Sequence, residues 1–168
     1  WSTAVAGPQF GIMRGGPQAS LEWATFTPRG PLGDTLVSLP GDLEQVAVDP
    51  RGPVFYGVRG NEVVRVDPAS GQTEPLVVDA GAPALNPPLS LAFDTKRRRL
   101  VVSSSHQSCW LGYDVDQKTW SLLGRPGSQI FALTYAASED AFYAFTESHG
   151  PFGSGCVKYN PFGAQLAR

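Results

Sequence analysis

The chain has 168 residues, of which 42% are apolar and 17% charged, and its formal net charge is −2. This apolar content is too high for a disordered chain, and the length fits one domain or a compact array of small repeats. The charge gives no basic excess to neutralise phosphates, so we expect no nucleic acid as partner. No run approaches the ~20 apolar residues of a membrane-spanning helix, so we expect no transmembrane segment.

Short apolar runs separated by turn residues follow one another along the chain. The 19 Gly and 15 Pro are spread throughout, which indicates many turns between short strands. The expected strands fall into four groups of four: 3–8, 10–14, 21–28 and 35–39; 45–50, 54–58, 62–68 and 75–78; 89–94, 100–104, 111–114 and 120–123; 131–135, 141–145, 156–161 and 164–166.

The third run of each group ends on a similar anchor, with successive copies 40, 47 and 46 residues apart. These anchors are Phe26-Thr27-Pro28, Val66-Asp67-Pro68, Tyr113-Asp114-Val115 and Tyr159-Asn160-Pro161. Asp, Asn or Thr at the first turn position can accept a hydrogen bond from the backbone two residues on, and Pro at the next position presets φ. The same turn chemistry accounts for Asp49 and Asp94.

This spacing is that of propeller blades, roughly 40–50 residues. We therefore predict an all-β fold, a β-propeller of four four-stranded antiparallel blades covering residues 1–168, with approximate blades 1–40, 41–85, 86–126 and 127–168. The four blades would form either a closed ring or half of a larger ring. The alternative is a β-sandwich, which also uses short strands with regular turns but does not require four similar quartets.

The blade pattern, with its Arg65-Val66-Asp67-Pro68-Ala69-Ser70-Gly71 segment, resembles NHL-type bacterial propeller repeats, and residues 113–120 look kelch-like without the kelch glycine pair. The resemblance covers residues 41–168 and more weakly 1–40, at the level of the fold. It implies a binding platform in most members of these groups and a hydrolase or lyase in a minority.

No catalytic signature emerges from the sequence. Gly153-Ser154-Gly155 lacks the spacing and the helix of a serine-hydrolase motif, and there is no Walker-type loop, HExxH or CxxC. The basic run at residues 96–99 is either a solvated turn or a phosphate site.

Both histidines and both cysteines occur between the second and third strands of the last two blades, in Ser105-His106 with Cys109 and in Ser148-His149 with Cys156. Three interpretations stay open: a Cys109–Cys156 disulfide between neighbouring blades, two unpaired thiols, or a metal site formed by His106, Cys109, His149 and Cys156. A disulfide would suit an extracellular or periplasmic location.

Loops held by a rigid scaffold usually carry function. The repeat alignment places seven candidate binding residues at one end of the blades: Arg59, Asn61, His106, Gln107, Trp110, His149 and Phe152. For Trp110 the alternative is packing between blades.

We expect a non-enzymatic binding or scaffold propeller without a cofactor, whose partner is a protein or a second copy completing the ring. The alternative is a metal-dependent hydrolase or lactonase of propeller fold that uses calcium or zinc. Because the chain begins at Trp1 and not Met, we also expect a processed chain, a fragment or the ordered part of a longer protein.

Overall fold

The computed structural model describes the backbone of most of the chain and the side chains from residue 40 onward, apart from those of residues 107, 147 and 167. The described residues are 3–6, 9–14, 20–27, 30–38, 40, 42–51, 54–67, 70–78, 82–87, 89–127, 129–147 and 155–167. His149 and Phe152, two of the candidate binding residues, lie outside them.

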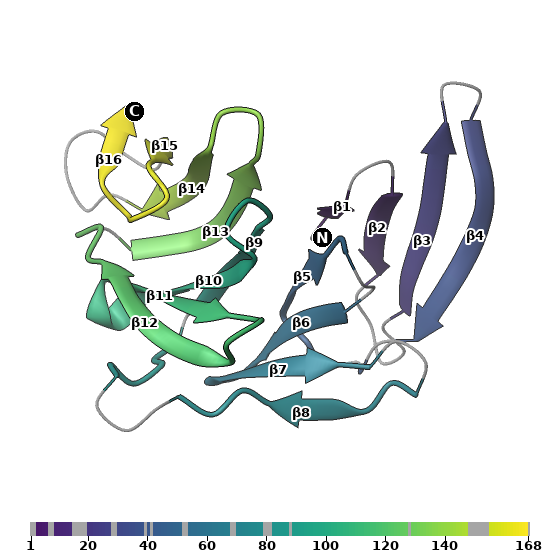
Figure 1. Cartoon of the computed structure of the whole chain (residues 1–168), viewed down its shortest axis with the longest axis horizontal. Helices are drawn as coiled ribbons and strands as arrows, with labels where there is room; N and C mark the ends of the chain where they lie inside the picture. Colours follow the sequence, from purple (N-terminus) through teal and green to yellow (C-terminus); the bar gives the residue numbers. More distant parts are fainter. Residues whose placement is uncertain are drawn as a thin grey trace. The chain divides into compact units, whose positions relative to one another are not determined.

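The described strands form four antiparallel sheets, each made of four consecutive strands that lie side by side in chain order (Figure 1). We call these sheets blades 1 to 4. Blade 1 contains β1 (Thr3–Ala6), β2 (Gln9–Arg14), β3 (Ser20–Thr27) and β4 (Gly30–Ser38). Blade 2 contains β5 (Gln45–Asp49), β6 (Val54–Arg59), β7 (Glu62–Val66) and β8 (Thr73–Pro75).

Blades 3 and 4 repeat this order. Blade 3 contains β9 (Leu89–Asp94), β10 (Arg99–Ser104), β11 (Cys109–Asp114) and β12 (Thr119–Gly124), with the 3-10 helix η1 (Ser105–Gln107) after β10. Blade 4 contains β13 (Gln129–Ala136), β14 (Ala141–Glu147), β15 (Gly155–Tyr159) and β16 (Gln165–Ala167). Within the described residues no helix is long and apolar enough to cross a membrane.

The all-β prediction is confirmed, and the described strands form four-stranded antiparallel meanders. The described strands do not form the alternative β-sandwich, because each sheet takes its strands consecutively and none of these strands crosses to another sheet. The chain divides into two compact units, Trp1–Arg59 with Val63–Leu76, and Gly60–Glu62 with Val77–Arg168. Unit 1 holds blade 1 and most of blade 2, and unit 2 holds blades 3 and 4 together with the β6–β7 connection.

The turn residues act as the sequence predicts. The Asp49 carboxylate accepts the N–H of Arg51 at 3.0 Å, and the Asp94 carboxylate accepts the N–H of Lys96 at 3.1 Å. Asp114 and Asn160 accept backbone N–H groups in the same way after the third strands of blades 3 and 4. These side chains replace water as partners of turn amides, and they fix where each strand ends.

The core of unit 2 lies between the facing sheets of blades 3 and 4. At its centre the ring of Trp110 meets Phe142 at 5.3 Å and Tyr159 at 5.2 Å between centroids. Ile130, Ala144 and Val157 complete this cluster from the blade 4 side and Ala92 and Val101 from the blade 3 side. Aromatic pairs at such distances add to the stabilisation that burial of their area already gives.

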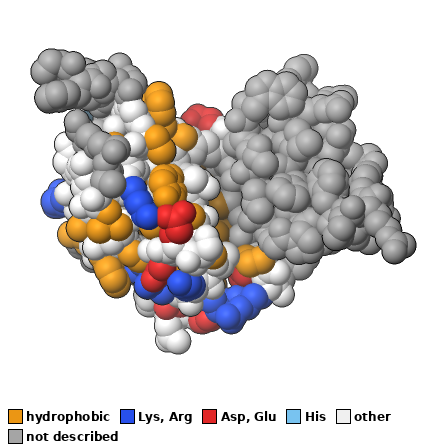
Figure 2. Space-filling model, turned by 90° about the horizontal axis from the view of Figure 1, so that it is seen from above, with side chains coloured by type: hydrophobic (Ala, Val, Ile, Leu, Met, Phe, Trp, Pro, Cys, Tyr) orange, Lys and Arg blue, Asp and Glu red, His pale blue; other side chains and the backbone are white. Residues whose placement is uncertain are grey.

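Some apolar side chains reach the surface, as Figure 2 shows for one face of the molecule. The large exposed ones among the described residues are Val77, Leu122, Phe131, Phe145, Phe162 and Leu166.

Candidate functional site

Four of the described candidate binding residues, Arg59, Asn61, His106 and Gln107, lie at the ends of blades 2 and 3 where the second strand gives way to the third. His106 is exposed in η1, and Gln107 ends that helix. In blade 2, β6 ends at Arg59, and Asn61 is exposed in the two-residue connection to β7. Each of these residues therefore stands at a strand end rather than within the apolar part of a sheet.

Arg59 is held by groups of its own blade. Its guanidinium donates to the Thr73 hydroxyl at 3.4 Å and lies 3.8 Å from the carboxylate of Asp42, in the segment that leads into β5. One third of the Arg59 side chain is exposed. The residue thus links three parts of blade 2 and still offers part of its charge to solvent.

The η1 loop is fastened by two serine hydroxyls that the sequence analysis missed. Ser105 Oγ donates to the carbonyl of Ile130 at 2.7 Å and accepts its N–H at 3.2 Å. Ser104 Oγ accepts the N–H of Asn86 at 3.0 Å and donates to its carbonyl at 3.1 Å. Both serines are buried, and they bind the segment before β9 and the first strand of blade 4 to the end of β10.

This anchoring gives the loop a fixed shape. The hydroxyls bind four backbone groups, two of them on buried Ile130, whose carbonyl also accepts from Ser90 Oγ at 3.3 Å. Buried backbone groups without a partner cost free energy. Ser108 closes η1 in the left-handed region, with φ of 45°. His106 is therefore displayed from a rigid base, and the signal in the sequence was the run of three serines at the end of a predicted strand.

Trp110 does not belong to this loop surface. It lies within β11 and is fully buried between blades 3 and 4. Because a buried ring cannot contact a partner, we remove Trp110 from the candidate surface. Trp110 packs between blades, which is the alternative that the sequence analysis gave.

The two cysteines are free thiols, Cys109 buried and Cys156 exposed. Side chains alternate between the two faces of a strand. Trp110 faces blade 4, so Cys109 points to the other side of blade 3; Val157 faces blade 3, so Cys156 points away from it. Both sheets therefore separate the two thiols, and the structure contains no disulfide between them.

The same geometry argues against a metal site that uses both cysteines. Cys109 and Cys156 cannot ligate one ion while both sheets stand between them. Across the described part of the chain, no three His, Cys, Asp or Glu side chains gather as metal ligands would. Burial raises the pKa of the Cys109 thiol, which favours its neutral form.

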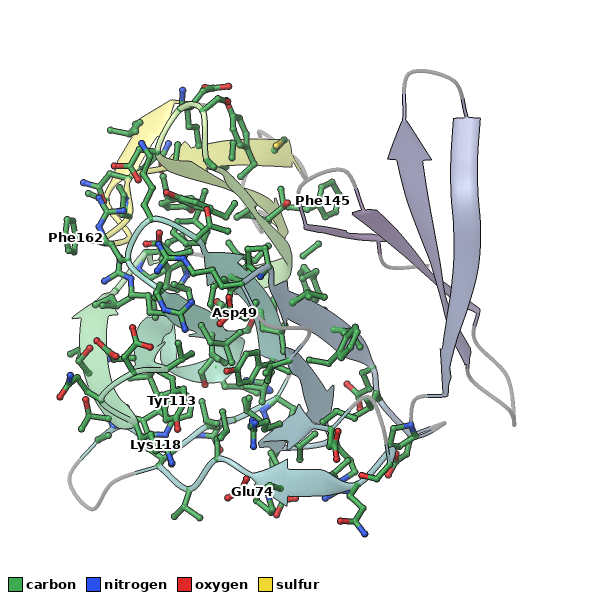
Figure 3. All side chains as sticks on the ribbon, turned by 45° about the vertical axis from the view of Figure 1, so that its right-hand side comes forward. Asp49, Glu74, Tyr113, Lys118, Phe145 and Phe162 are labelled. Atoms are coloured by element: carbon green, nitrogen blue, oxygen red, sulfur yellow. The ribbon has the colours of Figure 1, made fainter. Side chains whose placement is uncertain are left out.

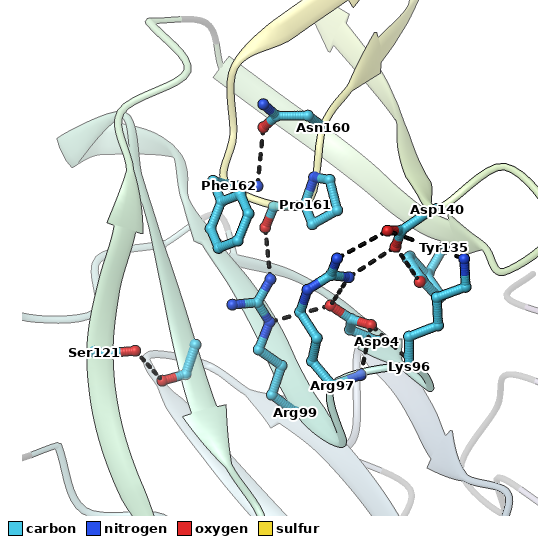
Figure 4. Close-up of polar contacts among 11 residues, drawn as sticks. Asp94, Lys96, Arg97, Arg99, Ser121, Tyr135, Asp140, Asn160, Pro161 and Phe162 are labelled. Carbon is cyan, nitrogen blue, oxygen red and sulfur yellow. Dashed lines mark hydrogen bonds and ion pairs between the residues drawn. The ribbon is translucent and has the colours of Figure 1, made fainter.

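A second polar cluster joins blades 3 and 4 at the other end of their sheets, between the β9–β10 and β13–β14 turns (Figure 4). Arg97 binds Asp140 with two nitrogens, at 2.7 and 2.8 Å, and also donates to Asp94 at 3.2 Å. Arg99 donates to Asp94 at 3.1 Å and to the carbonyl of Pro161 at 2.7 Å. Asp94, fully buried, thus receives two arginines from its own blade.

The electrostatics of this cluster follow from its pairing. The Arg97 guanidinium, helped by the Tyr135 hydroxyl at 2.7 Å, holds the pKa of Asp140 well below its usual range. Burial, followed by the hydrogen bond to Asp140, raises the pKa of Tyr135. Burial lowers the pKa of Arg99, and nearby Asp94 opposes that change.

The basic run at residues 96–99 is therefore neither a merely solvated turn nor a phosphate site. Arg97 and Arg99 bind carboxylates and a carbonyl, and Arg98 is paired with Asp116 at 2.9 Å. Lys96 lies 4.0 Å from Asp140. Arg97 and Arg99 therefore join blade 3 to blade 4, and Arg98 joins two turns of blade 3.

Comparison with known proteins supports the fold. No protein-family model and no curated protein matches the sequence. Among solved structures, hydrazine synthase of Kuenenia stuttgartiensis matches 98% of this chain and 47% of its own chain, with a TM-score of 0.61 and 14% identity. A chain of a nidogen/laminin complex matches 97% and 62%, with a TM-score of 0.64 and 14% identity.

TolB from Acinetobacter baumannii matches 94% of this chain and 39% of its own chain, with a TM-score of 0.61 and 15% identity. These neighbours are β-propellers, so the likeness shows that this chain is built from propeller blades. Identity at this level shows the fold alone and no specific repeat family. The chain spans less than two thirds of the length of each matched structure.

Proposed function

We propose that this chain is a non-enzymatic propeller module that binds a protein partner with the loops at the β6–β7 and β10–β11 ends of its blades. The observation that carries the proposal is the η1 loop, which two buried serines fasten to the backbone of Asn86 and Ile130 while His106 stays exposed. Preorganised loops lose less entropy on binding than mobile ones. An extracellular or periplasmic location forms part of the proposal, and one matched structure is described as an extracellular domain.

Capture of binding proteins from the native source tests this proposal. Immobilised wild-type chain is compared with the double variant Asn61→Ala/His106→Ala and with Gln117→Ala. Gln117 is a matched control because it is exposed in the β11–β12 turn, at the opposite end of its sheet.

We expect the double variant to retain at least about tenfold less of the specific partner, the effect of losing one modest hot spot. The control should retain it within about twofold. Equal retention by all three chains would remove these loops as the binding surface. A rise in melting temperature on adding calcium or zinc chloride would instead favour the metal-dependent hydrolase expected as the alternative.

A further inference from the structure

One face of blade 4 is exposed although the corresponding face of blade 3 is buried. The strand register pairs Leu100 with Tyr113 in blade 3 and Phe142 with Tyr159 in blade 4, which aligns the two sheets residue by residue. By this alignment Phe145 of blade 4 takes the place of Ser103 in blade 3. The comparison therefore rests on backbone pairing and not on sequence similarity.

In blade 3 one row across three strands consists of Ser90, Ser103 and Trp110, and blade 4 covers it completely. The equivalent row of blade 4 consists of Ala132, Phe145 and Cys156. All three are exposed; about half of the Phe145 side chain is accessible, and it projects from its sheet (Figure 3). We call this row, with neighbouring Phe131, the outer face of blade 4.

The outer face has the chemistry of a contact surface. Phe131 and Phe145 are 37% and 49% exposed, and Ala132 and Cys156 place no charge between them. Aromatic side chains bury 150–250 Å² each when covered, and contiguous exposed apolar residues commonly mark interaction sites. Lys158, paired with Glu139, borders the row on β15 and supplies a polar rim.

We propose that the outer face of blade 4 docks a four-stranded sheet of a second copy of this chain, in the way that blade 4 itself docks on blade 3. Blade 4 covers the row of Trp110 with an apolar sheet face, of which Phe142 and Tyr159 form part, so a sheet is the shape that fits this register position. A second copy supplies sheets of this kind. The chain spans 47%, 62% and 39% of three matched propellers, so each of those propellers contains more blades than this chain supplies.

The test measures the mass of the chain in solution by light scattering over a hundredfold range of concentration, together with the rate at which iodoacetamide modifies Cys156. The exposed thiol reports directly on whether the outer face is covered, and peptide mass spectrometry separates it from buried Cys109. Phe145→Glu places a charge in the centre of the face. Leu122→Glu is the matched control, because Leu122 is equally exposed on β12 of blade 3.

We expect a dimer whose Cys156 is modified at least fivefold more slowly than in the dilute monomer. Phe145→Glu should raise the dimer dissociation constant at least tenfold, and Leu122→Glu should leave it within twofold. Circular dichroism confirms that both variants are folded.

Three results would overturn the proposal. The first is a monomer with fast-reacting Cys156 at every concentration. The second is a monomer in which Cys156 is protected, because the cover would then come from the same chain. The third is equal weakening of the dimer by both variants, because the contact would then not lie on the outer face.

Discussion

Blades 3 and 4 have the same strand order and matching registers between their second and third strands, but opposite surroundings on equivalent faces. Trp110 in blade 3 and Cys156 in blade 4 occupy one register position, and the first is fully buried while the second is exposed. Their β-turns also correspond, with Arg98 and Asp140 both in the left-handed region at φ of 51° and 50°. The repeated backbone therefore fixes the face of the sheet on which each side chain lies. Whether a neighbouring sheet covers that face decides whether an apolar side chain there is buried and stabilises the fold.

The turns show how one backbone position can carry opposite charges. Arg97 of blade 3 corresponds to Glu139 of blade 4, and Arg97 pairs with Asp140 across the two blades. Glu139 instead forms an ion pair with Lys158 inside its own blade. The charge at this position thus joins blades in one repeat and stays within the sheet in the other.

The largest expected effect is a difference in stability between variants of Trp110 and Cys156, which occupy the same register position. Trp110→Ala should lower the free energy of unfolding by about 3–5 kcal/mol, because it opens a cavity in the core between the blades. Cys156→Ala should change it by no more than about 0.5 kcal/mol, as an exposed substitution does. Urea unfolding followed by circular dichroism measures both. Similar losses for the two variants would mean that the faces are not in different surroundings.

A medium effect is expected where blade 3 meets the last turn of blade 4. A Cβ added to Gly124 would stand 2.2 Å from the carbonyl oxygen of Phe162, whereas no described residue has an atom within 4 Å of a Cβ at Gly155. Gly124→Ala should therefore cost about 1–3 kcal/mol through overpacking. Gly155→Ala should stay within about 0.5 kcal/mol in the same urea experiment. If Gly124→Ala proved neutral, the two blades would not approach this closely.

The smallest effect is the pH dependence that the pair of Arg97 and Asp140 gives to the contact between the blades. Because the pKa of Asp140 is lowered in the folded state, its contribution is present above the unfolded carboxyl pKa of about 4 and is lost as pH falls below that value. Asp140→Asn should be less stable than wild type at pH 7, and the difference should shrink toward pH 2. Melting temperatures at pH 7, 5, 3 and 2 test this.

Gln117→Ala, an exposed substitution in the β11–β12 turn that removes no charge, serves as the control for the pH series. Its difference from wild type should be the same at every pH. Parallel curves for wild type and Asp140→Asn would show that Asp140 gains nothing from its partner in solution.

Much of the fold could be predicted because it depends on local chemistry. Asp49, Asp94, Asp114 and Asn160 form turns by bonding to amides a few residues on, and such bonds are visible in the sequence alone. Strands of alternating or continuous apolar residues lie between these turns. The positions of the strands could therefore be predicted to within a few residues.

The candidate site was predicted less well because it depends on the face of a strand. Cys109 and Cys156 looked equivalent, yet the register aligns Cys156 with Trp110, one residue later, and a shift of one residue moves a side chain to the other face. The partners of Arg97 could not be predicted either, because Asp140 lies 43 residues away. Contacts between repeats are set by packing, which a single sequence does not display.

The bonds between Ser105 and Ile130 bear on the order in which the chain acquires its structure during synthesis. Blade 3 is complete at Gly124, and its Ser105 hydroxyl then offers a donor and an acceptor to the backbone of Ile130, at the beginning of the next sheet. Blade 3 can in this way position the first strand of blade 4 as that strand leaves the ribosome. We expect this folding of one blade after another to limit incorrect pairing between similar strands of different blades.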